Sequence, residues 1–359
     1  MDGLPHDGSA RRTFPRHLGP ALALLATACS EPVVATWVLP EHARAFALRS
    51  EVVLDGPFDD MLVPVPADRR RVDALPGDTI ELTIFAADRQ HVLDPEELDA
   101  AYYVCGSCIA TLRGDRLDLP CDGTVETLVR GCLVARDARP RITLPDDGPV
   151  ATAAAALSSG LVAFAIAGVP EVGDTDACID AVRTRPFGDL GDCNLVQQSL
   201  SLGPTWVLSA ALLGIESLDD LPPELSPELF LQPPNFAPEV ERFMVEADGA
   251  TAPTIVEVGD TIDVRPGQSL RVEIEIDPRD RQRSILAIED GEPRRRVEYA
   301  LQRWFTSAEL PGMASDREVF VDFVVPERSE AAPLRLDVLR YDGTGGVAWG
   351  SLYLRMSGG

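Results

Sequence analysis

The feature that most constrains the fold of this chain is an internal repeat. The segment "DALPGDTIELTIFAADRQ" at residues 73–90 aligns with "DVRPGQSLRVEIEIDPRD" at residues 263–280, and a Pro-Gly pair stands at the same place in both. After each Pro-Gly pair, apolar residues alternate with polar ones. This alternation predicts a strand with one face on a core and the other face in water. We therefore expect a mainly β protein that uses one fold unit twice.

The second copy predicts a β-sandwich in residues 239–359, after a proline-rich linker at 221–238. Candidate strands lie near 240–247, 254–264, 269–277, 296–304, 318–325, 334–341 and 347–356. About seven short strands separated by turn signals are typical of an immunoglobulin-like (Ig-like) sandwich. The segment resembles the Ig-like and PKD-like modules of bacterial surface proteins. The resemblance rests on the Pro266-Gly267 turn with its strand, on Tyr299 and Trp304, and on the closing hairpin "VLRYDGTGGVAWGSLYLRM".

The first copy predicts a more irregular Ig-like module in residues 41–150, with strands in "HARAFALRSEVVL", "AYYVCGSCIATL" and "RITLP". Residues 151–220 then predict a small insertion, with a buried strand "GLVAFAIAG" and helices in "DTDACIDAV" and "GPTWVLSAALLGI". The uncharged run that begins this insertion is rich in Ala, Ser and Gly, which contribute little to membrane insertion, so we do not expect a membrane span. The expected architecture is two Ig-like β-sandwich modules with a small, disulfide-clipped helical insertion between them.

Residues 1–28 have the pattern of a signal peptide. Three arginines precede an uncharged segment at 18–28, which is far shorter than the roughly 20 residues that span a bilayer. "RRTF" at 11–14 also looks like the core of a twin-arginine signal, so the export route stays open between the general and the twin-arginine pathway.

The small residues at 26–28 lead into Cys29, and this site resembles the lipobox of bacterial lipoproteins. The resemblance implies that Cys29 is lipidated and becomes the first residue of the mature chain, with 29–40 as the tether. Ser30 resembles the outer-membrane sorting pattern of that family. The alternative is ordinary signal-peptidase cleavage, which would leave Cys29 as a free thiol.

Six further cysteines are an even number, which in an oxidising compartment predicts three disulfides. They are Cys105, Cys108, Cys121, Cys132, Cys178 and Cys193. Cys178 and Cys193 stand apart from the others, and we expect them to pair. The pairing among the other four stays open. "CGSC" at 105–108 offers a thiol-disulfide redox motif as an alternative, and a zinc site with Cys121 and Cys132 is a third, although the flanking residues favour strand and structural disulfides.

Charge and composition exclude several function classes. Residues 29–359 carry 29 arginines against 56 acidic residues, a net charge of −27, which excludes nucleic acid and anionic lipid head groups as partners. Only His42 and His91 follow residue 28, too few for a multi-histidine metal site. No G-x-S-x-G is present, and "GTGGVA" at 343–348 predicts a hairpin turn rather than a nucleotide loop.

Four acidic clusters could bind Ca²⁺ through carboxylate oxygens. None of them follows a known calcium-loop pattern, so solvated surface charge is the simpler interpretation. The clusters are Asp146-Asp147, Asp174 with Asp176, Asp277 with Asp280, and Glu289-Asp290.

The sequence therefore predicts a lipid-anchored protein of the bacterial outer membrane with a non-enzymatic binding or scaffolding role. A protein or glycan of the envelope is the expected partner, and no catalytic residue, metal or cofactor is expected. The alternatives are a thiol-disulfide redox protein that uses Cys105 and Cys108, and a Ca²⁺-dependent adhesion module.

Overall fold

A computed structural model describes most of the chain from residue 38 onward. The described residues are 38–105, 112–113, 116–117, 132–144, 161–184, 190–204, 233–280, 283–289, 292–297, 301–311, 313–315, 320–327, 333–342 and 345–357. All of them belong to one unit, Trp37–Gly359, while Met1–Thr36 form a second unit that lies outside the described residues.

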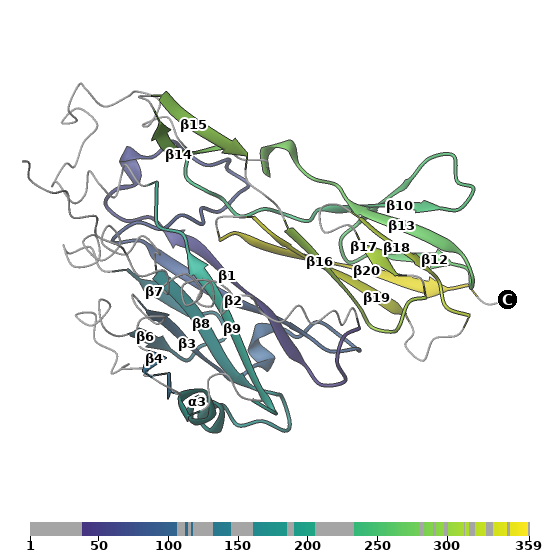
Figure 1. Cartoon of the computed structure of the whole chain (residues 1–359), viewed down its shortest axis with the longest axis horizontal. Helices are drawn as coiled ribbons and strands as arrows, with labels where there is room; N and C mark the ends of the chain where they lie inside the picture. The colour runs from purple at the N-terminus through teal and green to yellow at the C-terminus, as the bar shows by residue number, and fades with distance from the viewer. Residues whose placement is uncertain are drawn as a thin grey trace, which may run out of the picture. The chain divides into compact units, whose positions relative to one another are not determined.

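The first β-sandwich, module 1, contains the first copy of the repeat. One sheet has the order β1-β2-β7, with bounds Arg44–Leu54, Thr79–Ala87 and Arg141–Thr143. The other has the order β6-β3-β8-β9, with bounds Cys132–Ala135, Ala100–Cys105, Leu161–Gly168 and Cys193–Leu200 (Figure 1). In Ig lettering, β1, β2 and β7 take the places of strands A, B and E, and β3, β8 and β9 those of C, F and G.

Module 2 has the second copy and the same plan. Its first sheet has the order β11-β10-β13-β18-β17, with bounds Thr254–Glu257, Arg242–Ala247, Ser269–Ile274, Phe320–Val324 and Ala314–Ser315. Its second has the order β12-β20-β19-β16, with bounds Thr261–Val264, Val347–Met356, Leu334–Tyr341 and Leu301–Thr306. Here β10, β13 and β18 correspond to A, B and E, and β16, β19 and β20 to C, F and G. The chain is therefore mainly β, with two sandwich-like modules.

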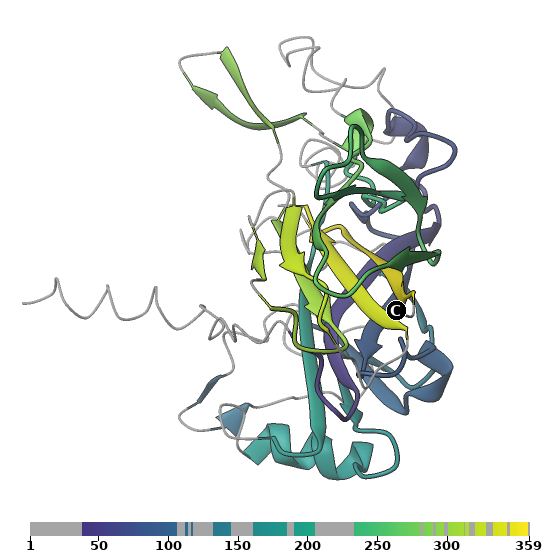
Figure 2. The same cartoon turned by 90° about the vertical axis from the view of Figure 1, so that its right-hand side faces the viewer.

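The remaining elements are short. They are the hairpin strands β4 (Leu112–Arg113), β5 (Arg116–Leu117), β14 (Arg283–Glu289) and β15 (Glu292–Val297), the 3₁₀ turns η1 (Asp59–Met61), η2 (Pro95–Glu97) and η5 (Pro278–Asp280), and the helix α3 (Thr175–Thr184). Among the strands that the structure describes, β14 and β15 form a two-stranded sheet of their own (Figure 2). No helix within the described residues is long and apolar enough to cross a membrane.

The repeat extends to individual backbone hydrogen bonds. Gly77 and Gly267 have φ angles of 83° and 74°, the left-handed conformation that a Pro-Gly turn requires. In module 1 the Gly77 amide donates to the Leu144 carbonyl at 3.0 Å. In module 2 the Gly267 amide donates to the Val325 carbonyl at 2.9 Å. Each turn therefore joins the end of strand E at the same point.

A side-chain oxygen closes each of these turns in the same way. The residue after the Pro-Gly pair accepts a hydrogen bond from the amide of the residue before it. Asp78 Oδ2 accepts from the Leu75 amide at 2.6 Å, and Gln268 Oε1 accepts from the Arg265 amide at 2.9 Å. In module 1 the carboxylate of Asp78 also holds the buried guanidinium of Arg71 through two hydrogen bonds of 2.8 and 3.1 Å.

Strand β2 departs from the predicted half-exposed pattern, because both of its faces are buried. Ile80, Leu82 and Ile84 point into the core of module 1. On the opposite face Phe85 packs in a second cluster with Leu339 of module 2. The other buried members of this cluster, which we call the seam, are Leu39, Ala47, Ala87 and Val347. The face expected in water is therefore covered by the other module.

The proline-rich segment that ends at residue 238 is paired with module 1 over its described part. Phe236 forms an antiparallel bridge with Arg71, and the Asn235 amide donates to Asp73 Oδ2 at 2.7 Å. Asn235 Nδ2 also donates to Asp342 Oδ2 of module 2 at 3.2 Å. The segment thus contacts both modules.

A buried ion network lies beside this segment. Arg340 Nη1 donates to Asp280 Oδ2 at 3.0 Å, and Arg69 Nε lies 3.5 Å from Asp280 Oδ1. Arg69 comes from module 1 and also pairs with Glu239 and, at 3.1 Å, with Asp277. Because the side chains of Arg69, Asp280 and Arg340 are buried, loss of one partner would leave a buried charge uncompensated, which costs about 3–5 kcal/mol in comparable cases.

The predicted insertion shares a sheet with module 1. The strand expected at "GLVAFAIAG" is β8, which pairs with β3 and with β9. The sheet therefore continues across the boundary that we expected at residue 150. Between β8 and β9 the chain forms α3, which packs on the outer face of this sheet through Ile179 and Val182 (Figure 1). The second helix, expected at "GPTWVLSAALLGI", lies outside the described residues except for its first two positions.

We predict that Phe85→Ala destabilises the protein by about 3–5 kcal/mol, because it leaves a cavity between the Phe46 and Trp349 rings. Urea unfolding followed by circular dichroism measures the change. Ile255→Ala, at a side chain that is 58% exposed, is the control and should stay within about 0.5 kcal/mol of the parent. A cost below about 1 kcal/mol for Phe85→Ala would show that the seam contributes little.

A second prediction concerns Asp73, whose pKa is raised above its ordinary value by burial. The folded state then binds a proton at pH values where the unfolded chain does not, so this carboxyl adds stability as the pH falls through its folded pKa. From pH 7 to pH 4 the free energy of unfolding of the parent should rise relative to that of Asp73→Asn. Urea titrations at both pH values test this, with Asp248→Asn as a surface control. A constant difference between parent and Asp73→Asn would contradict the prediction.

Candidate functional site

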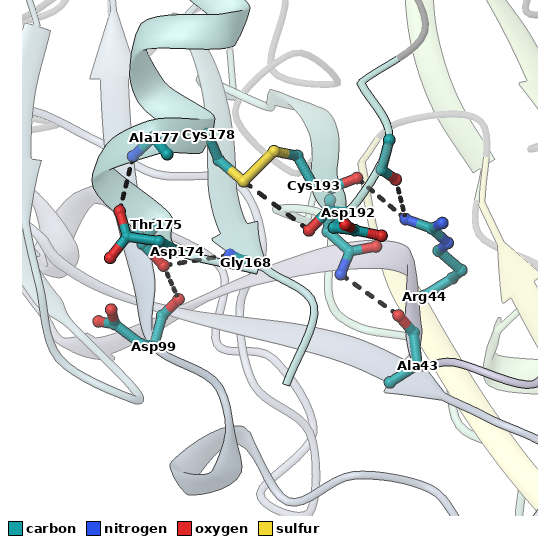
Figure 3. Close-up of a disulfide and its surroundings, with 12 residues drawn as sticks. Ala43, Arg44, Asp99, Gly168, Asp174, Thr175, Ala177, Cys178, Asp192 and Cys193 are labelled. Carbon is teal, nitrogen blue, oxygen red and sulfur yellow. Dashed lines mark hydrogen bonds between the residues drawn. A yellow bond between two sulfur atoms is a disulfide. The ribbon is translucent and has the colours of Figure 1, made fainter. Parts of the chain in front are cut away.

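The predicted disulfide between Cys178 and Cys193 is confirmed. It joins α3 to the first residue of β9 across a sequence separation of 15, with a Cα–Cα distance of 5.4 Å (Figure 3). Two hydrogen bonds fix the start of α3 without involving the disulfide. Asp174 Oδ1 accepts from the Ala177 amide at 2.8 Å, and the Thr175 hydroxyl donates to the Asp99 carbonyl at 2.5 Å. One short helix is therefore clipped to the sheet, as expected.

The other predicted cysteine sites are placed only in part. Cys105 ends β3 and lies directly opposite Cys132 of β6 in antiparallel register. Cys108, Cys121 and the predicted lipidation site Cys29 lie outside the described residues. The register places the backbones of two of the four clustered cysteines opposite each other, and the side chains of both lie outside the described residues.

The described acidic residues of the predicted clusters have protein partners. Asp176 pairs with Arg136, and Asp174 caps α3. Asp277 accepts from Arg279 Nε at 2.8 Å, and this hydrogen bond lowers the pKa of Asp277 to about 2. Asp146, Asp147 and Asp290 lie outside the described residues, as does the side chain of Glu289.

Metal-ligand geometry is absent from the described part of the chain. No group of three or more His, Cys, Asp or Glu side chains there is placed to hold a metal ion. His42 is exposed. His91 Nδ1 lies 3.3 Å from Asp88 Oδ1, and its side chain is half-exposed.

A cavity of about 320 Å³, partly open to the surface, lies at the edge of the seam. Residues of β1, β2, the segment after β2 and β20 line it. They are Arg49, Thr83, Ile84, Phe85, Val92, Leu93, Asp94, Pro95, Arg139 and Trp349. A volume of this size falls at the lower end of the range for small-molecule sites.

Two aromatic rings and two guanidinium groups define the chemistry of this cavity. The rings of Phe85 and Trp349 lie 5.2 Å apart between centroids. The guanidinium carbon of Arg49 lies 4.5 Å from the centroid of the Trp349 ring, a cation–π contact. Arg139 Nη2 lies 3.7 Å from Asp94 Oδ1 across the lining. The cavity therefore combines apolar walls with cationic groups.

Sequence reasoning did not find this cavity. Trp349 lies in the predicted closing hairpin of module 2, and Arg49 lies in a predicted strand of module 1. The two meet only because one module packs on the other, and local periodicity carries no signal for that contact.

No protein-family model matches the chain, and no curated protein matches it. Among solved structures, a nucleoside hydrolase-related protein from Saccharophagus degradans, associated with carbohydrate metabolism, aligns at 7% identity and a TM-score of 0.23 over 45% of this chain and 35% of that one. The chain thus spans about a third of that protein's length.

Two further solved structures align with most of this chain. A tandem of titin Ig domains aligns at 10% identity and a TM-score of 0.17, over 88% of this chain and 98% of that one. Latent PorU from Porphyromonas gingivalis aligns at 11% identity and a TM-score of 0.21, over 89% of this chain and 24% of that one. The chain is a mainly β protein with weak structural similarity to Ig-like domains, and this similarity carries no functional argument.

We expect Cys105 and Cys132 to form a disulfide. Directly opposed residues of antiparallel strands have Cα atoms about 4.5–5.5 Å apart, within the span that a disulfide bridges. Peptide mapping of the unreduced protein should recover one peptide pair joined through these two residues, with the Cys178–Cys193 pair as internal control. Recovery of Cys105 joined to Cys108 would contradict this pairing.

Proposed function

We propose that the protein is a lipid-anchored component of the bacterial cell envelope that binds or scaffolds a partner and catalyses no reaction. The observation that carries the proposal is the Cys178–Cys193 disulfide. Disulfides persist in oxidising compartments outside the cytosol, so the disulfide supports export of the chain. The lipobox-like residues at 26–29 supply a means of attachment to the membrane.

The joined modules support a binding role. A rigid scaffold holds its surface loops in place, which lowers the entropic cost of ordering those loops when a partner binds. The seam and the ion network of Arg69, Asp280 and Arg340 join the two sandwiches into such a scaffold. An envelope protein or glycan is the partner class that we propose.

The two alternatives have less support. A redox role would require Cys105 and Cys108 to form the reactive pair, but Cys105 ends a strand and faces Cys132 in register. A C-x-x-C motif of the thioredoxin type instead follows a strand and opens a helix. Calcium-dependent adhesion would use free carboxylates, whereas Asp174, Asp176 and Asp277 are engaged by protein donors.

Membrane fractionation with a Cys29→Ala variant tests the anchor. The parent should partition into the detergent phase and sediment with outer membranes, because two or three acyl chains form a stable tether. Cys29→Ala should be released with the soluble periplasmic proteins.

Ser30→Asp supplies the matched control, since it keeps the lipidated cysteine and changes only the proposed sorting residue. It should remain in the detergent phase but leave the outer membrane fraction. Equal detergent partitioning of the parent and Cys29→Ala would refute the tether, and reduced thiols in a cytosolic parent would refute the whole proposal.

A further inference from the structure

We propose that the seam cavity binds a small organic carboxylate with an apolar body. The carboxylate would contact Arg49 and Arg139, and the apolar body would lie against Phe85 and Trp349. This inference rests on the binding function proposed above and names the class of ligand for one site.

The size of the cavity suits such a ligand. At about 320 Å³ it is about twice the volume of an engineered cavity that holds benzene. A single ring with a short acidic side chain fits this volume, whereas a folded protein or a long glycan does not. The ligand is therefore a small molecule or one terminal group of a larger one.

The walls favour an apolar body. Phe85 and Trp349 present neighbouring rings, and Val92, Leu93 and Pro95 add aliphatic surface. Ligand sites typically combine such walls with a few polar groups that fix orientation. In this cavity the polar groups are mainly cationic.

Arg49 is the principal recognition residue. Its guanidinium lies over the Trp349 ring, which fixes its position. Its Nε atom is buried and forms an ion pair with Glu51, whose Oε1 lies 3.6 Å away, while the side chain as a whole is 30% exposed. A ligand carboxylate in the cavity would accept a charge-assisted hydrogen bond from the exposed end of this guanidinium.

The charge of the lining selects for an anion. Arg49 and Arg139 share the lining with one acidic residue, Asp94, which pairs with Arg139, and Glu51 pairs with Arg49 from outside the lining. Asp94 is also engaged elsewhere, because its Oδ1 accepts from the Glu96 amide at 3.1 Å and caps η2. The lining is therefore net cationic in a chain of net charge −26.

Isothermal titration calorimetry with phenylacetate tests the proposal, and phenylacetamide is the uncharged probe of nearly the same shape. The mature full-length protein is titrated with each probe in the same non-ionic detergent. Phenylacetate should bind at least tenfold more tightly than phenylacetamide, as expected for a charge-assisted contact. Absence of phenylacetate binding at millimolar concentration, or equal binding of the two probes, would overturn the proposal.

Variants locate the site. Arg49→Gln should weaken phenylacetate binding at least tenfold and leave phenylacetamide binding unchanged, while Trp349→Ala should weaken both. Arg355→Gln, at an exposed arginine paired with Asp263 far from the lining, is the control and should bind like the parent. Arg139→Gln serves as the second charge variant if the melting temperature shows that Arg49→Gln is unfolded. Unchanged phenylacetate binding in the folded charge variants would reject this site.

The two proposals fail separately. Fractionation of the parent and Cys29→Ala does not depend on the cavity. A parent that remains membrane-bound but shows no carboxylate binding would reject the ligand and leave the tether standing.

Discussion

The contact on which the rest of the structure depends is the burial of the outer face of β1 and β2 against β19 and β20. Phe85 and Ala47 supply one side of this seam, and Leu339 and Val347 the other. Hydrophobic burial of this kind is non-directional, so polar groups must set the register between the modules. The Tyr341 hydroxyl, which donates to the Phe46 carbonyl at 3.2 Å, and the Arg69–Asp280–Arg340 network serve that purpose. The cavity lies at the edge of the seam, where Trp349 packs against Phe85.

The local part of the fold was predictable from sequence because it depends on local chemistry. A Pro-Gly pair followed by an alternating strand predicted β2 and β13, and the turn residues predicted the hairpin of β19 and β20. The Cys178–Cys193 pairing followed from spacing alone. The candidate strand at 254–264 was only partly right. It divides at Gly259, whose φ of 87° turns the chain so that β11 and β12 join different sheets.

The rest depended on contacts between distant segments. The buried outer face of β2 and the apolar strand β8 could not be assigned to partners, because apolar residues signal burial without naming what covers them. β8 is buried on both faces, with the module 1 core on one side and α3 on the other. The same limit hid the cavity, since its lining comes from segments some 300 residues apart in sequence. A single arginine or tryptophan in the sequence does not indicate that it shares a site with residues far away along the chain.

The position of α3 has a consequence for how many such modules can be stacked. The modules associate head to tail, with the A–B face of one on the C–F–G face of the other, and a contact of that type can in principle continue through further copies. The C–F–G face of module 1 is closed to another copy, because α3 covers Tyr103 and Phe164 there. The A–B face of module 2 carries the exposed ion pair Arg271–Asp322 together with the exposed side chain of Ile255. The helix thus caps the outer face of module 1, in the way that an end repeat closes one end of a solenoid.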